Sequence, residues 1–179
     1  MFRKISVVVI WCSLFLLACE NDLAEVQKLV SADDVQVETM KGVEILFSDS
    51  AVVRVRLTGP VMLRHLNPSD IQQEFTEGIN VDFFDGNRNV TGQLTAKYGI
   101  RFENQARAIV RDSVVWQSNG GDKLETEELI WDERTQKVYT DKFVTITRPD
   151  EIIYGYGFEA DQDFTYSRIK AVEGTIKIE

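Results

Sequence analysis

The sequence predicts an all-β fold, and three observations lead to this prediction. From residue 35 onward, apolar and polar residues alternate almost continuously, as expected for strands with one dry face. Clusters of Gly, Pro, Asn, Asp and Ser separate the alternating runs and supply the backbone angles or local hydrogen bonds that turns need. Only residues 20–34 have helix-like apolar spacing. About ten short antiparallel strands must then curl or pair so that their dry faces meet, as a sandwich, a jellyroll or an open barrel.

The residues before this β region predict an export signal followed by a linker to the membrane. Residues 1–4 are basic, and the apolar run at residues 5–18 is shorter than the roughly 20 residues that a spanning helix needs. Leu16-Leu17-Ala18-Cys19 resembles a lipobox, which implies cleavage before Cys19 and acylation of its sulfur. An uncleaved anchor helix is the alternative. We predict a signal peptide at 1–18, a lipidated N-terminus and linker at 19–34, and one domain at 35–179.

The first predicted strands carry apolar residues at every second position. They span residues 35–37, 43–47, 53–57, 79–83 and 94–102. Turn signals between them include Asp49-Ser50, Gly59-Pro60, Asn67-Pro68-Ser69 and Asp85-Gly86-Asn87. Because successive side chains of a strand point to opposite faces, each apolar set predicts one buried sheet face.

The later predicted strands span residues 110–116, 124–131, 138–146, 152–158 and 172–178. Turn signals separate them at Asn119-Gly120-Gly121, Pro149-Asp150 and Asp161-Gln162-Asp163. Asp112 is an exception to the alternation. It is a charged residue on the same predicted strand face as the apolar residues Val110, Val114 and Trp116. A weak internal repeat lays residues 94–114 over residues 124–143, which suits a jellyroll that lengthens by adding hairpins.

Composition and charge narrow the possible ligands. The chain has 179 residues, 44% of them hydrophobic, and a formal charge of −9 at pH 7. This acidic balance argues against nucleic acid, whose binding depends on neutralising phosphates. It also argues against electrostatic binding of anionic lipid head groups over a broad surface. A negatively charged lipid would therefore have to be held by its acyl chains in an apolar interior.

The sequence predicts no catalytic or metal site. His65 is the single histidine, and it has neither a second histidine nor a spare cysteine as a partner. Acidic pairs such as Asp82 with Asp85, and Glu125 with Glu127, are interpreted as solvated faces of strands. We therefore predict a protein that is not an enzyme and needs no cofactor or metal.

The chain resembles the LptC family, the periplasmic component of the lipopolysaccharide export transporter. The resemblance lies in residues 124–132, 139–146 and 153–161, and it extends to residues 43–49, 75–85 and 94–98. With the lipobox-like start, it is similar to the lipoprotein form of Bacteroidetes-type bacteria. It implies a V-shaped, open two-layer antiparallel β-jellyroll that is lipid-anchored at the periplasmic face of the inner membrane, and an outer-membrane location is the alternative.

The resemblance also implies a ligand and partners. Lipopolysaccharide would be accepted from an inner-membrane ABC transporter, whose permease jellyroll domains would face the strands at residues 35–47, and passed to an LptA-like periplasmic bridge protein. The C-terminal strand would pair with that bridge through Val172, Gly174, Ile176 and Ile178. The predicted lipid-binding residues on the interior face are Phe47, Val55, Phe83, Tyr98, Phe102, Trp116, Trp131, Val144, Ile146, Tyr154, Tyr156 and Phe158.

A different class of function stays open beside this one. A lipoprotein with a solid β-sandwich core could bind a protein or a glycan on its surface. The interior volume separates the two, because a filled sandwich has no room for acyl chains.

Overall fold

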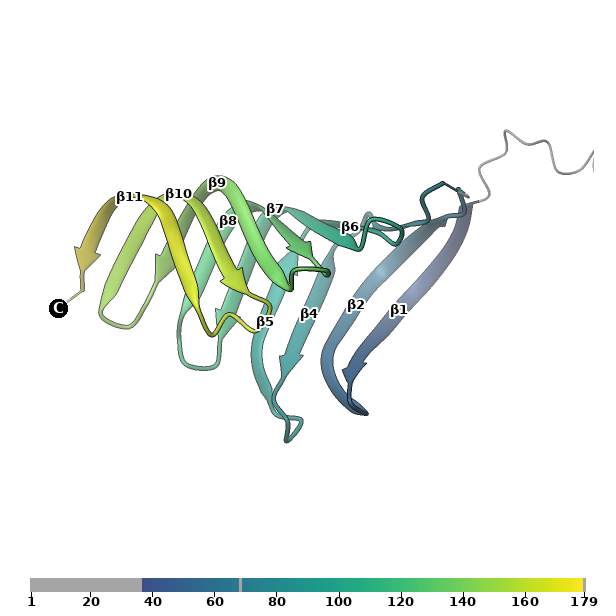
Figure 1. The fold of residues 1–179 in the computed structure, drawn as a ribbon, viewed down its shortest axis with the longest axis horizontal. Helices are drawn as coiled ribbons and strands as arrows, with labels where there is room; N and C mark the ends of the chain where they lie inside the picture. Colours follow the sequence, from purple (N-terminus) through teal and green to yellow (C-terminus); the bar gives the residue numbers. More distant parts are fainter. Residues whose placement is uncertain (1–36, 68, 179) are drawn as a thin grey trace, which may run out of the picture. The chain divides into compact units, whose positions relative to one another are not determined.

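The computed structural model describes residues 37–67 and 69–178, and the regular elements among them are eleven β-strands (Figure 1). The predicted all-β class is therefore confirmed. The strands are β1 (Val37–Asp49), β2 (Val52–His65), β3 (Gln72–Phe75), β4 (Ile79–Phe84), β5 (Val90–Ala96), β6 (Tyr98–Phe102), β7 (Arg107–Ser118), β8 (Lys123–Asp132), β9 (Lys137–Thr147), β10 (Glu151–Asp161) and β11 (Ser167–Lys177). The predicted signal peptide, the linker and Cys19 lie outside the described residues. None of the described residues belongs to a helix with the length and hydropathy of a membrane span.

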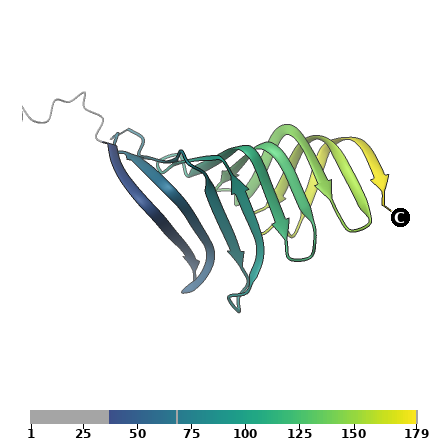
Figure 2. The same ribbon diagram turned by 180° about the vertical axis from the view of Figure 1, so that it is seen from behind.

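All eleven strands belong to one antiparallel sheet that divides between β2 and β7. β4 and β5 connect these two strands on one side, and β3 and β6 connect them on the other. We call the layer that contains β4 and β5 leaf A, and the layer that contains β3 and β6 leaf B. The long strands β7 to β11 contribute one half to each leaf and arch over between them (Figures 1 and 2). The two leaves form the predicted open jellyroll.

β7 and β10 change leaf where their pairing is irregular. In β7 the register shifts between Arg111 and Val114, and Asp112 and Ser113 have positive φ angles of 64° and 57°. In β10 the register shifts at Gly157, whose φ is 72°. A bulge of this kind leaves a residue unpaired, bends its strand and increases the local twist. Asp112, which breaks the alternation in the sequence, thus marks a bend and not a strand face.

The leaves meet through apolar side chains, which fill one half of the interior more completely than the other. The register of leaf A aligns one cross-strand row of Leu57, Val81, Leu94, Trp116, Leu124 and Ile146. Burial is deepest toward β11, where Val144 and Ala160 are 0% exposed and Phe158 is 2% exposed. Burying a side chain such as Val, Leu or Phe stabilises the fold by about 1.5–3 kcal/mol. Deeply buried side chains also lie on the strands nearer β1, such as Met62 at 3% and Phe75 at 2% exposed, so both halves contribute to stability.

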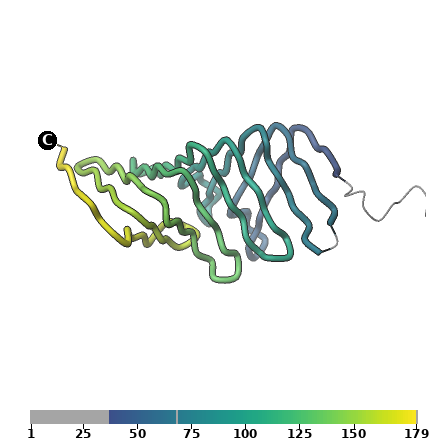
Figure 3. Tube along the Cα trace, turned by 90° about the horizontal axis from the view of Figure 1, so that it is seen from above, coloured from purple at the N-terminus to yellow at the C-terminus, as the bar shows by residue number. Residues whose placement is uncertain are grey.

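The strands at the two ends of the sheet are edges. β1 pairs only with β2, and β11 only with β10, among the described residues. Figure 3 shows β1 and β11 at opposite ends of this part of the chain. β1 runs without a break through two segments that the sequence predicts as separate strands. The body therefore presents two unpaired backbone edges that face in opposite directions.

A polar network covers the outside of leaf A. The buried carboxylate of Asp82 accepts hydrogen bonds from Arg56 Nε (2.9 Å), Arg56 Nη2 (2.6 Å) and Gln93 Nε2 (2.8 Å). The Arg56 guanidinium also lies over the ring of Phe84, 5.6 Å from its centroid. Burial raises the pKa of Asp82, but the hydrogen bonds from Arg56 and Gln93 and the charge of Arg56 outweigh it, so the pKa lies below its ordinary value.

Replacing Asp82 with Asn should destabilise the fold in a pH-dependent way. We expect D82N to lower the free energy of unfolding at pH 7 by about 1–3 kcal/mol, because a buried charged acceptor is lost. Asp82 has a lower pKa in the folded chain than in the unfolded one, so this contribution is present above about pH 4 and is lost as the pH falls through the folded value. Denaturant unfolding at pH 7 and at acid pH measures it. Asp141→Asn, with its side chain 85% exposed, is the control; equal losses in both variants would contradict the prediction.

Candidate functional site

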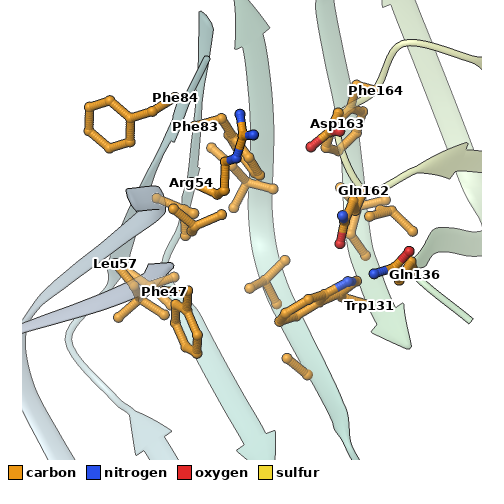
Figure 4. A pocket seen from close by; sticks show the side chains of 18 of the residues that line it. Phe47, Arg54, Leu57, Phe83, Phe84, Trp131, Gln136, Gln162, Asp163 and Phe164 are labelled. Atoms are coloured by element: carbon orange, nitrogen blue, oxygen red, sulfur yellow. The ribbon is translucent and has the colours of Figure 1, made fainter. Parts of the chain in front are cut away.

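A cleft of about 750 Å³ lies between the leaves in the half of the interior nearer β1 (Figure 4). Leaf A supplies apolar lining residues from β1, β2 and β4, namely Phe47, Val55, Leu57, Val81 and Phe83. Leaf B supplies others from β3, β7, β8 and β9, namely Phe75, Val110, Leu129, Trp131 and Val138. Many of these side chains are only half-buried. Because both walls are inner faces of amphipathic strands, the cleft is apolar over most of its surface.

An aromatic contact spans the cleft between β1 and β8. The rings of Phe47 on β1 and Trp131 on β8 meet edge to face, with centroids 6.4 Å apart. The Arg101 guanidinium lies 5.8 Å from the centroid of the Phe47 ring. Glu133 accepts two hydrogen bonds from Arg101, at 2.6 and 3.1 Å, and the pKa of Arg101 is raised by this partner. Arg101 is therefore a neutralised cation and not a free site for an anionic head group.

Trp131 also brings a polar atom into the cleft wall. Its indole Nε1–H is buried and has no hydrogen-bond partner among the described residues. A buried donor left unpaired costs about 1–3 kcal/mol. A ligand carbonyl in the cleft could remove that cost, so Trp131 combines an apolar surface with one directional donor.

The cleft ends at Phe164, in the turn between β10 and β11. Figure 4 shows Phe164 across the cleft from Phe83. Its ring stacks on Trp116 of leaf A, with centroids 4.3 Å apart. Beyond this stack the side chains of the two leaves are packed together. The interior is thus open in one half and filled in the other.

Eight of the predicted lipid-binding residues lie on the inner faces, divided between these halves. Phe47, Val55, Phe83 and Trp131 line the cleft. Trp116, Val144, Ile146 and Phe158 belong to the packed half. Their contact with lipid stays a prediction.

The predicted inward orientation is wrong for four aromatic residues. Tyr98 and Phe102 lie on the outer face of leaf B, where they pair with Arg111 and Arg107. The alternation is reversed because the chain bends at Lys97, between β5 and β6, where its N–H bonds to Asp112.

Tyr154 and Tyr156 lie on the outer face of leaf A, and Tyr156 is 51% exposed. The bulge at Gly157 turns Phe158 inward and leaves Tyr156 outward. Both tyrosines contact the ring of Phe143, which is itself exposed. These three rings form an outer aromatic patch.

Sequence reasoning missed several residues of the cleft. Leu57 and Val81 belong to predicted strands, but nothing in the pattern separates a cleft wall from a packed core. Phe164 carried a partial signal, because it is one of two aromatic residues in this turn, and the sequence does not show that Phe164 rather than Tyr166 points inward. Arg101 carried none, since its inward position depends on the bend at Lys97.

The single histidine belongs to a hydrogen-bonded network on the outer face of leaf B. His65 Nε2 lies 2.8 Å from one oxygen of the Glu74 carboxylate, and Tyr98 donates to the other at 2.9 Å. Burial and the bond to Glu74 raise the pKa of Tyr98 to about 12. The described residues contain no group of three or more side chains suited to hold a metal ion. This network is remote from the cleft and ties β2, β3 and β6 together.

The edge strands expose apolar side chains. On β11 and after it, Val172, Ile176 and Ile178 are 58%, 53% and 46% exposed. Gly174 has no side chain, and the Tyr154 hydroxyl covers the place where its Cβ would stand. On β1, Leu46 is 55% exposed. Both edges therefore combine unpaired backbone with uncovered apolar surface.

Comparison with known protein families gives one match. The family model described as "Lipopolysaccharide-assembly, LptC-related" matches residues 5–173, which is nearly the whole chain. A search of curated proteins finds no match.

The Tyr98 phenol should titrate at unusually high pH. We expect one tyrosine to ionise near pH 12, and Y98F to lose that step. Tyr98 is stabilised in its neutral form, so its contribution to stability is present below about pH 10 and is lost as the pH rises toward the folded value. Tyrosinate absorbance during alkaline titration measures the step. Tyr166→Phe is the control, and a step that survives in Y98F would refute the assignment.

Proposed function

Because the chain belongs to the LptC-related family of lipopolysaccharide-assembly proteins, we propose that it accepts lipopolysaccharide from an inner-membrane ABC transporter and passes it to a periplasmic bridge of similar jellyrolls. The family takes part in lipopolysaccharide transport and is associated with the periplasm and the inner membrane. The observation that carries the proposal is the apolar cleft of about 750 Å³ between the two leaves. In this role the chain catalyses no reaction and supplies a surface along which lipid moves.

The chemistry of the cleft suits acyl chains. Ligand pockets in proteins typically enclose about 300–1,000 Å³, and this cleft lies in that range. Each methylene that leaves water contributes about 0.8 kcal/mol, so several buried methylenes bind strongly without any charge contact. The unpaired Nε1–H of Trp131 is suited to an ester or amide carbonyl at the base of an acyl chain. The formal charge of −9 makes this apolar mode more plausible than capture of an anionic head group.

The two edge strands suit end-to-end assembly. An unpaired strand exposes backbone donors and acceptors that a partner strand can complete. In our proposal β11 pairs with an LptA-like bridge protein, and β1 faces the permease jellyroll domains of the transporter. The exposed apolar residues on both edges support this, because a neighbouring sheet would cover them.

We also propose that the chain is a lipoprotein of the Bacteroidetes type, anchored to the inner membrane through an acylated Cys19. The lipobox-like sequence at residues 16–19 supports this anchor. Mass spectrometry of the mature N-terminus tests it, because acylation at Cys19 adds the mass of lipid to the first peptide.

One observation favours the alternative of a surface-binding lipoprotein. The outer aromatic patch of Phe143, Tyr154 and Tyr156 is exposed on leaf A and could contact a protein or a glycan. That alternative requires a filled interior, however, and the cleft argues against it. A charged residue in place of Val55 in the cleft wall distinguishes the two functions, because surface binding does not depend on the cleft wall.

Placing a charge in the cleft should prevent lipid binding. We expect Val55→Arg to reduce photo-crosslinking of purified lipopolysaccharide to a probe at Val81 by about tenfold or more, because a charged group makes the apolar wall unfavourable for acyl chains. An arginine at this half-buried position can extend to solvent, so the fold should survive. Leu46→Arg on the outward face of the same hairpin is the matched control. Undiminished capture by V55R would argue against the cleft as the lipid site.

Proline substitutions should distinguish the backbone N–H groups of β11 that face solvent from those that bond to β10. Of two consecutive residues in an antiparallel edge strand, one directs its N–H to the neighbouring strand and the other directs it to solvent. We therefore expect one of Thr175→Pro and Ile176→Pro to lower the thermal midpoint clearly, and the other to leave it nearly unchanged. The stable variant should lose co-purification with the LptA-like bridge protein. Retained co-purification in that variant would end the proposal for this edge.

A further inference from the structure

The turn between β10 and β11 differs from two neighbouring hairpin tips on the same side of leaf B. The tips at residues 103–106 and 133–136 join β6 to β7 and β8 to β9, and both are built mostly from polar residues. The tip at residues 162–166 is one residue longer and contains Phe164. Each tip has one residue with a positive φ: Ala106, Gln136 and Phe164. In the tip between β10 and β11, the residue with the unfavourable positive φ is therefore a bulky aromatic one. Its ring points into the interior.

The Phe164 ring joins the leaves at the boundary between the open half and the packed half. It stacks on Trp116 of β7 at 4.3 Å between centroids, with 15° between the ring planes. It meets Phe83 of β4 edge on at 5.8 Å, and Phe158 of β10 at 6.3 Å. Phe83 and Trp116 belong to leaf A, whereas Phe164 is carried by a tip of leaf B. The stack therefore both closes the end of the cleft and holds the leaves together.

The turn that carries Phe164 is braced as one unit. One oxygen of the Asp161 carboxylate accepts the N–H of Thr165 at 2.7 Å, and the other accepts the N–H of Tyr166 at 3.2 Å. The Phe164 N–H bonds to the Asp161 carbonyl at 3.1 Å, and the Asp161 N–H bonds to the Tyr166 carbonyl at 3.1 Å. The unit begins at the last residue of β10 and ends where β11 starts. The turn is therefore anchored on Asp161 of β10 and leads directly into β11, so a movement of this hairpin would carry the Phe164 ring with it.

Behind Phe164 there is no room for lipid while the leaves are closed. Val144 and Ala160 are 0% exposed there, and Phe158 is 2% exposed. Gly157, with a φ of 72°, and the bulge at Asp112 and Ser113 provide bends about which the leaves can separate. The direct path through the interior from the cleft to β11 runs past the Phe164 stack.

We infer that Phe164 is a gate that stops acyl chains at the end of the cleft, and that it must leave its stack with Trp116 before lipid can reach the β11 edge. The inference rests on the proposed lipid-transfer function. It adds that the protein is closed toward its outgoing end, and that a partner strand on β11 is placed to move the gate.

The test compares lipid capture on the two sides of the gate. A photo-reactive residue is placed either at Val81, which lines the cleft, or at Ile169, which packs against the core beyond Phe164. Purified lipopolysaccharide is the probe, and the full-length protein is used without its partners. We expect strong capture at Val81 and weak capture at Ile169. Phe164→Ala should raise capture at Ile169 several-fold, so that the ratio of capture at Ile169 to capture at Val81 rises.

Control variants keep the result interpretable. Tyr166→Ala removes an aromatic residue of the same turn that is 63% exposed, and it should leave capture at both positions unchanged. Phe164→Leu keeps an apolar plug and tests the gate if F164A fails to fold; it should give an intermediate increase at Ile169.

The outcomes separate the gate from the function on which it rests. Capture at Val81 with no increase at Ile169 in F164A and F164L would overturn the gate alone. Equal capture at Ile169 and Val81 in the unaltered protein would also overturn it. Absence of capture at Val81 in every variant would overturn the lipid-transfer function and the gate together.

Discussion

The structure depends on one constraint: a single antiparallel sheet with one dry face has to fold over on itself to bury that face. Bulges make this possible, because the unpaired residues at Asp112, Ser113 and Gly157 bend strands that would otherwise run straight. Each long strand then supplies residues to both leaves. At the bend, the alternation of inward-facing and outward-facing side chains changes phase. The interior, the outer networks and the two edges all follow from where these bends fall.

The interior that results is uneven, and this unevenness matters for function. Near β11 the leaves touch, and side chains such as Val144 and Phe158 are almost completely buried. Near β1 they stand apart, with the Phe47–Trp131 contact spanning the gap. Side chains buried in both halves, such as Phe75 and Phe158, stabilise the fold although the interior is not filled throughout. A protein that has to hold lipid and release it needs both conditions, since a uniformly filled core has no volume for a ligand and an empty one would collapse.

Charge is placed where it does not compete with lipid. The buried Asp82 is neutralised by Arg56 on the outside of leaf A, and Arg101 in the cleft wall is neutralised by Glu133. The only histidine is used in an outer network with Glu74. These pairs leave the cleft walls mostly apolar, so the affinity that we propose comes from burial of methylenes and not from ion pairs. Backbone edges then provide the specificity for partners, because strand pairing depends on main-chain geometry.

The sequence by itself determined the all-β class, the run of strands and the family, because alternation and turn residues are local properties of the chain. It also identified Phe47, Val55 and Trp131 as inward-facing. The tertiary structure decided which face of the sheet Tyr98 and Tyr156 lie on. A bend or a bulge exchanges the inward-facing and outward-facing positions of the residues on its two sides. It also decided that the cleft is open in one half only and ends at Phe164. Volume depends on how far two leaves stand apart, and that distance is set by contacts between residues far apart along the chain.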